Sequence, residues 1–162
     1  MTFQHDISPL LRARAYIELA VVSAQQRQEQ EGLYYMSLAQ ECYPEYPEAD
    51  PSFLYAEFSP SSLILEEGLT HLALARHNPD SDRHYSQQAW NTFARIETLK
   101  TQMPIPERIR VEILNYQATA ALALKDVDAF CDRLEQGMHG AKRLGSAKRR
   151  QEAIEVCDNS PA

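Results

Sequence analysis

Residues 8–22 read SPLLRARAYIELAVV, and this stretch decides the fold. Ser8 is a preferred N-cap residue, and Pro9 suits the first helical position, where its missing N–H has no hydrogen bond to lose. The apolar residues that follow recur every three or four positions, which is the spacing of one face of an α-helix. The same start signal returns at Ser59-Pro60, ahead of a second run with helical spacing. The sequence therefore predicts an all-α fold built from similar helical units.

The units are predicted to be three antiparallel helical hairpins in a single domain over residues 1–162, at about 8–44, 59–101 and 104–145. A terminal helix is predicted at about 146–158, begun by a serine N-cap, and should shield the apolar face of the last hairpin. The stretch between the first two hairpins is rich in proline and aromatic residues. We expect it to be an ordered loop packed on the helices.

The hairpin turns are predicted near Arg27, Arg76 and Lys125, which are evenly spaced along the chain. Even spacing of similar units is the mark of a repeat architecture. Gly145 is predicted to end the second helix of the third hairpin, because glycine adopts the left-handed conformation of a helix stop without strain. On the fourth helix, Trp90 and Phe93 are predicted core residues.

Charge and composition exclude several classes of protein. The chain has 16 basic and 23 acidic residues and a net charge of -7, so direct nucleic-acid binding is not expected. One basic cluster, residues 142–150, is interpreted as a solvated helix face. The N-terminus lacks the apolar core of a signal peptide, and no apolar run approaches the ~20 residues of a membrane span. Three widely spaced cysteines are interpreted as free thiols. We expect a cytoplasmic protein without a membrane partner.

Small and large residues alternate in the predicted hairpins, at Tyr16, Leu19, Ala20, Gly32, Met36, Ala39 and Pro44 in the first, and at Leu114, Ala118, Leu134 and Gly137 in the third. This alternation resembles the tetratricopeptide repeat, a hairpin of ~34 residues. The first hairpin carries the most matches, and the third departs from the pattern at Phe130, where the family has a small residue. The resemblance implies a right-handed α-solenoid of about three hairpins plus the terminal capping helix.

Segments 13–39, 51–56 and 120–145 are similar to the C-terminal repeat domain of bacterial helix-turn-helix transcriptional regulators. This narrower resemblance implies a part that senses a peptide or a protein partner, and so a role in transcription regulation. In that group a DNA-binding domain precedes the repeats, and none is present here. We expect either a part of a longer regulator or a stand-alone relative.

The resemblance also implies which residues line a ligand groove. Family groove positions fall on the first helix of each hairpin, and Asn115 is the most informative of them because an amide both donates to and accepts from a peptide backbone. Its alternative role is that of a solvated or helix-packing asparagine. The predicted groove residues are Arg14, Ile17, Val21, Glu66, Thr70, Glu112, Asn115 and Thr119.

Two other functions stay open beside a protein- or peptide-binding module. The terminal helix, apolar through Ala153, Ile154 and Val156, could pair with a second copy and make a homodimer. A metal-dependent enzyme would use Glu67 and His71, which share a helix face, or the histidines around residue 80. The sequence has no HExxH motif, no paired cysteines and no glycine-rich phosphate loop. We therefore expect no enzyme, no cofactor and no metal.

Overall fold

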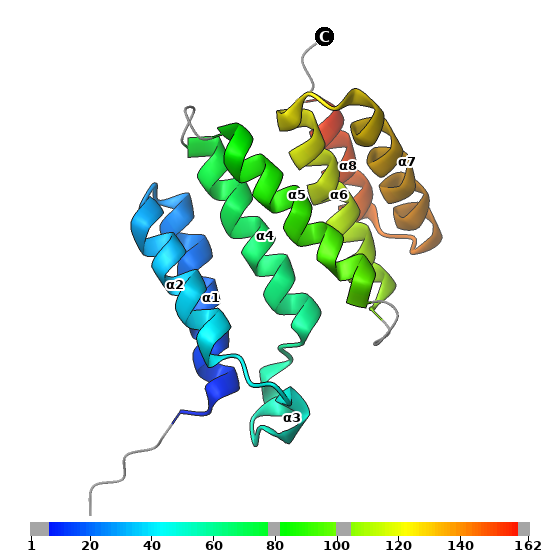
Figure 1. Ribbon diagram of the computed structural model, residues 1–162. Coiled ribbons are helices and arrows are strands. Elements are labelled where there is room, and N and C mark those ends of the chain that lie inside the picture. The colour runs from blue at the N-terminus through cyan, green and yellow to red at the C-terminus, as the bar shows by residue number, and fades with distance from the viewer. Residues whose placement is uncertain (1–6, 78–81, 100–104, 159–162) are drawn as a thin grey trace, which may run out of the picture.

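The computed structural model describes residues 7–77, 82–99 and 105–158 of the chain. These residues form eight α-helices and one 3₁₀-helix, with no strand among them (Figure 1). The prediction of an all-α fold is confirmed. The elements are α1 (Pro9–Gln25), α2 (Glu29–Cys42), η1 (Pro47–Ala49), α3 (Phe53–Ala56), α4 (Pro60–His77), α5 (Asp82–Leu99), α6 (Glu107–Leu124), α7 (Val127–Arg143) and α8 (Ala147–Asp158).

The helices pack in adjacent pairs, α1 with α2, α4 with α5, and α6 with α7 (Figure 1). Neighbouring pairs meet in two different ways, since α1 packs against α4 whereas α5 packs against α6. The terminal helix α8 packs against both α6 and α7, as expected of a cap. Because the two junctions use different helices, a regular right-handed solenoid stays a prediction.

Local capping chemistry fixes where the helices begin. At four helix starts a side-chain oxygen accepts a free N–H of the first turn, which satisfies a donor that has no partner inside the helix. The pairs are Ser8 with the Leu11 N–H at 3.2 Å, Ser59 with Ser62 at 3.2 Å, Asp126 with Ala129 at 3.0 Å, and Ser146 with Arg149 at 3.3 Å.

Two of the three predicted turn residues are left-handed, Arg27 with φ 66° and Lys125 with φ 61°. The third, Arg76, is the last residue but one of α4, which ends at His77, so the helix ends within one residue of the predicted position. The rest of that turn and the predicted hairpin ends at 101 and 104 lie outside the described residues. Gly145, with φ +61°, follows α7 as predicted.

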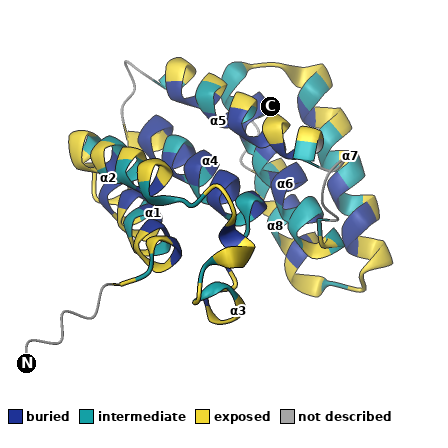
Figure 2. Cartoon of the chain, turned by 60° about the horizontal axis from the view of Figure 1, so that its bottom comes forward, coloured by how far each residue is buried: buried dark blue, intermediate teal, exposed yellow. Residues whose placement is uncertain are grey.

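The segment between α2 and α4 packs on the first hairpin, as expected. Phe58 is buried, Phe53 packs beside it, and the Leu10 N–H donates to Asp50 Oδ2 at 3.1 Å. The short helix α3 nevertheless presents exposed residues to solvent (Figure 2). Leu54 and Tyr55 are 82% and 84% exposed.

The core of the middle pair rests on a close contact between a glycine and a ring. A Cβ added at Gly68 on α4 would lie 2.1 Å from Cε1 of Phe93, which is fully buried on α5. Trp90 of α5, also predicted as a core residue, is partly buried. It packs against two clusters of buried residues, one formed by α4, α5 and α6 and the other by α6 and α7. The Arg133 guanidinium lies 5.6 Å from the centre of its ring. Phe130 is buried too, so the third hairpin accommodates a large residue in place of a small one.

None of the helices in the described part of the chain is long and apolar enough to cross a membrane.

Substituting Gly68→Ala should lower the free energy of unfolding. Alanine favours the helix by about 1 kcal/mol, but overpacking against Phe93 costs about 1–3 kcal/mol. Urea unfolding measures the net loss. The matched control is the Gly68→Ala/Phe93→Leu double variant, in which the smaller side chain makes room for the methyl group. Its loss should be smaller than the sum of the two single losses. Additive losses would contradict the close contact.

Candidate functional site

The predicted groove residues differ in where the structure places them. Ile17 and Thr70 are fully buried, because α1 and α4 pack directly against each other. They contribute to the core, so the expectation that they line an accessible groove was wrong. Val21 is partly buried. The polar members Arg14, Glu66, Glu112, Asn115 and Thr119 lie on α1, α4 and α6 and surround the candidate site described below.

Four charged side chains from the first helices of the three pairs lie within electrostatic range of one another. The pKa of Glu66 on α4 is raised, first by burial and then by the carboxylates of Glu18 and Glu112, while Arg14 opposes the shift. Arg14 bonds Glu18 Oε1 through Nε at 2.9 Å and donates to the Ala56 carbonyl through Nη1. The first helices therefore share one acidic surface, which we call the groove face.

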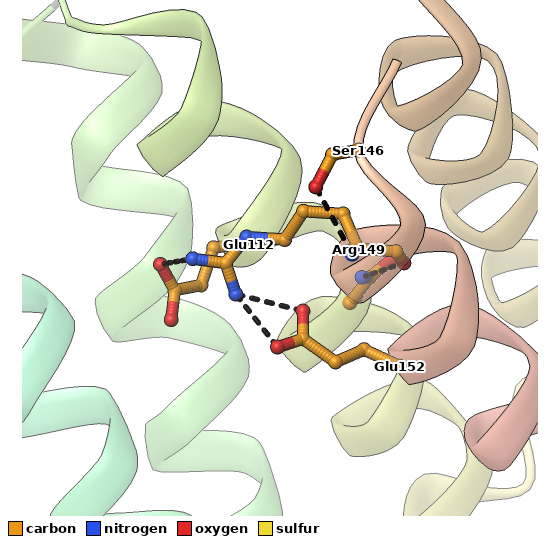
Figure 3. Close-up of polar contacts among 5 residues, drawn as sticks. Glu112, Ser146, Arg149 and Glu152 are labelled. Carbon is orange, nitrogen blue, oxygen red and sulfur yellow. Dashed lines mark hydrogen bonds and ion pairs between the residues drawn. The ribbon is translucent and has the colours of Figure 1, made fainter. Parts of the chain in front are cut away.

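The terminal helix α8 lies against α6 on this groove face and is held there by Arg149 (Figure 3). The Arg149 guanidinium donates to both carboxylate oxygens of Glu152, at 2.8 and 2.7 Å, and to Glu112 across the interface. Only 7% of the Arg149 side chain is exposed. Burial alone would lower the pKa of Arg149, but the hydrogen bond to Glu152 and the charges of both carboxylates more than offset it and raise that pKa.

Asn115 acts on the chain itself. Its Nδ2 donates to the backbone carbonyl of Arg149 at 3.2 Å, and the side chain is buried between α6 and α8. The second amide atom, Oδ1, has no hydrogen-bond partner within the described residues and lies where a Cβ at Gly137 would come within 2.5 Å. The structure thus places Asn115 as a helix-packing residue that binds a backbone carbonyl of α8.

A pocket of about 270 Å³ opens beside this contact, between the end of α4, α6 and α8. Asn115 and Thr119 line it, and the Thr119 hydroxyl donates to the Asn115 carbonyl at 3.1 Å. Burial, and then the charges of Glu112 and Glu152, raise the pKa of Tyr116 to about 12, so its hydroxyl is neutral at physiological pH. The lining residues are Arg76, Asn115, Tyr116, Thr119, Leu122, Glu152, Glu155 and Val156.

The residues considered for a metal site are not assembled into one. Glu67 is buried and bonds Gln40 Nε2 at 3.0 Å and Arg95 Nη1 at 2.8 Å. His71 stacks on Tyr85 with ring centroids 6.2 Å apart. The described residues contain no group of three or more His, Cys, Asp or Glu side chains that could hold a metal ion. The predicted loop around Asp80 lies partly outside those residues.

Sequence reasoning missed Arg149 and Glu152, which hold α8 in place. The basic cluster 142–150 was interpreted as a solvated face, and this is wrong for Arg149, which is buried. The three-residue spacing of Arg149 and Glu152, just after a serine N-cap, was a signal for a local ion pair on one helix face. Nothing in the sequence indicates that Glu112 completes the pair from another helix.

A scan against protein-family models and searches of curated proteins and of solved structures each found no match to this chain. The site must therefore be interpreted from its own geometry.

Substituting Arg149→Met should lower the free energy of unfolding by about 1–3 kcal/mol, because it leaves Glu112 and Glu152 facing each other without their cation. The penalty stays below that of a fully buried pair, since the two carboxylates are 20% and 29% exposed. Urea unfolding measures the change. Arg150→Met, at an exposed neighbouring position of α8, is the matched control and should change it little. Equal effects of the two substitutions would argue against the ion pair.

His71 should make the protein sensitive to mild acid. Burial, and then the nearby His84, lower the pKa of His71 from 6.5 to about 4. Between these two pH values the unfolded chain binds a proton at His71 and the folded chain does not. Its contribution to stability is complete above the unfolded pKa and is lost as the pH falls toward the folded pKa. On going from about pH 7 to about pH 5 this loss is about 2 kcal/mol. His71→Phe, which keeps a ring against Tyr85, should reduce the loss by about that amount in urea titrations at both pH values.

The control is His139→Gln, at an exposed position of α7. It should leave the acid sensitivity as it is in the unsubstituted protein. If His71→Phe loses as much stability in acid as the unsubstituted protein does, His71 is not the group that takes up the proton.

Proposed function

We propose that the chain is a protein-binding module that holds a segment of a partner protein on the groove face of α1, α4 and α6. The observation that carries the proposal is the docking of α8 on this face. A helix of the chain is held there by one arginine between two carboxylates and by Asn115 at its backbone. Charge-assisted hydrogen bonds to arginine and an amide that binds backbone are common means of segment recognition.

The part of the groove face over α1 and α4 offers the same chemistry without an occupant from the described residues. Glu66 is half-buried there, and its carboxylate makes no hydrogen bond or ion pair within the described part of the chain. Arg14, the nearest cation, is engaged with Glu18 and with the Ala56 carbonyl. A cation from a partner would offset the repulsion between Glu66 and its acidic neighbours. The proposed partner segment therefore carries arginine or lysine.

Binding rather than catalysis is the proposed role, without cofactor or metal. The acidic groove face and the net charge of -7 favour a basic protein segment over a nucleic acid. The resemblance to the repeat domains of bacterial regulators supports, by analogy alone, a sensing or interaction part of a transcriptional regulator. Any contact with DNA would then belong to another domain.

Panning a displayed library of random helical peptides against the purified chain tests the proposal. We expect the enriched peptides to carry arginine or lysine. Their dissociation constants, measured by fluorescence anisotropy, should rise about tenfold with Glu66→Gln, which corresponds to about 1.4 kcal/mol. Glu135→Gln, at an exposed acidic position of α7, is the matched control for the loss of one negative charge.

Three results would count against the proposal: no enrichment, enrichment of peptides without basic residues, or equal binding to the two variants. Because both substitutions leave the shape of the side chain unchanged, a difference between them reports the position of the charge. Raising the salt concentration should weaken binding to the unsubstituted chain, as expected of partly exposed ion pairs.

A further inference from the structure

The helix α1 exposes apolar residues on the side opposite its core. Leu10, Ala13 and Ile17 are fully buried against the rest of the protein. On the other side, successive residues four, four and three positions apart form one line along the helix. These residues, which we call the α1 stripe, are Leu11, Ala15, Leu19 and Val22; all four are exposed, and the three larger ones are 37%, 44% and 46% exposed.

The helix α7 of the third pair provides a comparison, because one of its sides faces solvent. The residues of α7 that point away from its core are charged or polar, as expected of an amphipathic helix facing water. They are Asp128, Asp132, Glu135, His139 and Lys142, all exposed. Scattered exposed apolar residues are ordinary, but a continuous line on one helix marks an interaction surface. A helix that is apolar on opposite sides is normally covered on both.

We propose that a second copy of this chain covers the α1 stripe, with the two α1 helices antiparallel about a twofold axis. A twofold interface requires a self-complementary surface. In this arrangement the stripe of one copy runs in the opposite direction to that of the other, so Leu11 lies against the partner's Val22. It also sets Ala15 against the partner's Leu19, so a small residue faces a large one, as close helix packing requires.

The charges beside the stripe fit the same arrangement. Arg14 and Glu18 lie one turn apart along one edge of α1 and already form an ion pair. A twofold axis through the centre of the stripe places the side of α1 that carries Arg14 and Glu18 beside the same side of the other copy's α1, which runs in the opposite direction. Glu18 then lies beside the partner's Arg14, and the reverse pair forms by symmetry. A stripe bordered in this way favours a second copy over an unrelated apolar helix.

The alternative homodimer considered from the sequence would use the terminal helix instead. In the structure α8 packs on its own chain through the fully buried Ala153 and the ion pair of Arg149 with Glu112, while Ile154 is 43% exposed. The α1 stripe lies on another helix than α8 and borders the groove face at Arg14 and Glu18, but the inference does not depend on the proposed function.

Sedimentation equilibrium tests the inference on the full chain. The interface of one helix pair is small, so we expect a reversible dimer with a dissociation constant of about 10–100 µM. Leu19→Glu places a carboxylate at the centre of the interface and should raise that constant at least about 30-fold. Leu54→Glu, at an exposed leucine of α3, is the matched control and should leave it unchanged. Circular dichroism should give the same helix content for all three proteins.

A chain that stays monomeric up to about 1 mM would overturn the inference, since a dissociation constant of about 10–100 µM makes most of the chain dimeric at that concentration. A dimer that Leu19→Glu leaves intact, or that Leu54→Glu disrupts equally, would overturn it too, because the interface would lie elsewhere. If Leu19→Glu lowers the helix content, Ala15→Glu replaces it. This position is exposed on the same stripe, and glutamate is a good helix former.

Discussion

Close approach of paired helices, made possible by a glycine in each pair, is the constraint on which the rest of the structure depends. In the first pair Gly32 of α2 lies against α1, where an added Cβ would be 3.3 Å from the Ala20 carbonyl. In the second, Gly68 faces the ring of Phe93, and in the third Gly137 faces Asn115 of α6. A larger residue at these positions would push the helices apart.

The groove face is a product of that geometry. Because α1, α4 and α6 are each held close to a second helix, their remaining sides present Arg14, Glu66 and Glu112 to one surface. Burial raises the electrostatic cost of the carboxylates there, which the raised pKa of Glu66 records. The protein relieves this cost over α6 by inserting Arg149 of α8, whereas over α4 Arg14 offsets it only in part. On the proposed function, a cation of the partner offsets the remainder.

How far the sequence predicts the structure depends on the range of the interactions involved. The starts at Ser8, Ser59, Asp126 and Ser146 follow from contacts three residues apart, so a local pattern is enough to place them. Carrying over the groove positions of a repeat family failed at Ile17 and Thr70. That step assumes a fixed packing between successive pairs, whereas here α1 and α4 pack directly on each other and bury both residues.

The docking of α8 lay beyond sequence reasoning for the same reason. Glu112 and Arg149 are 37 residues apart, and only the fold brings them together. The turns near Arg27, Arg76 and Lys125, by contrast, are local features: Arg27 and Lys125 are left-handed, and α4 ends at His77, one residue after Arg76. Features that depend on which helix faces which are decided by tertiary packing, and local patterns carry little information about them.

The docking of α8 also makes the two parts of the groove face unequal for any ligand. A partner that binds over α6 must first displace Arg149, which exposes Glu112 and breaks the contact of Asn115 with the α8 backbone. Its apparent affinity is reduced by the fraction of chains in which α8 is already detached. On the proposed function, a partner that binds over α1 and α4 would meet no such cost and would place its cation beside Glu66. For equal contacts, the second mode is therefore tighter, and a segment long enough to reach α6 can use its remaining binding energy to release α8.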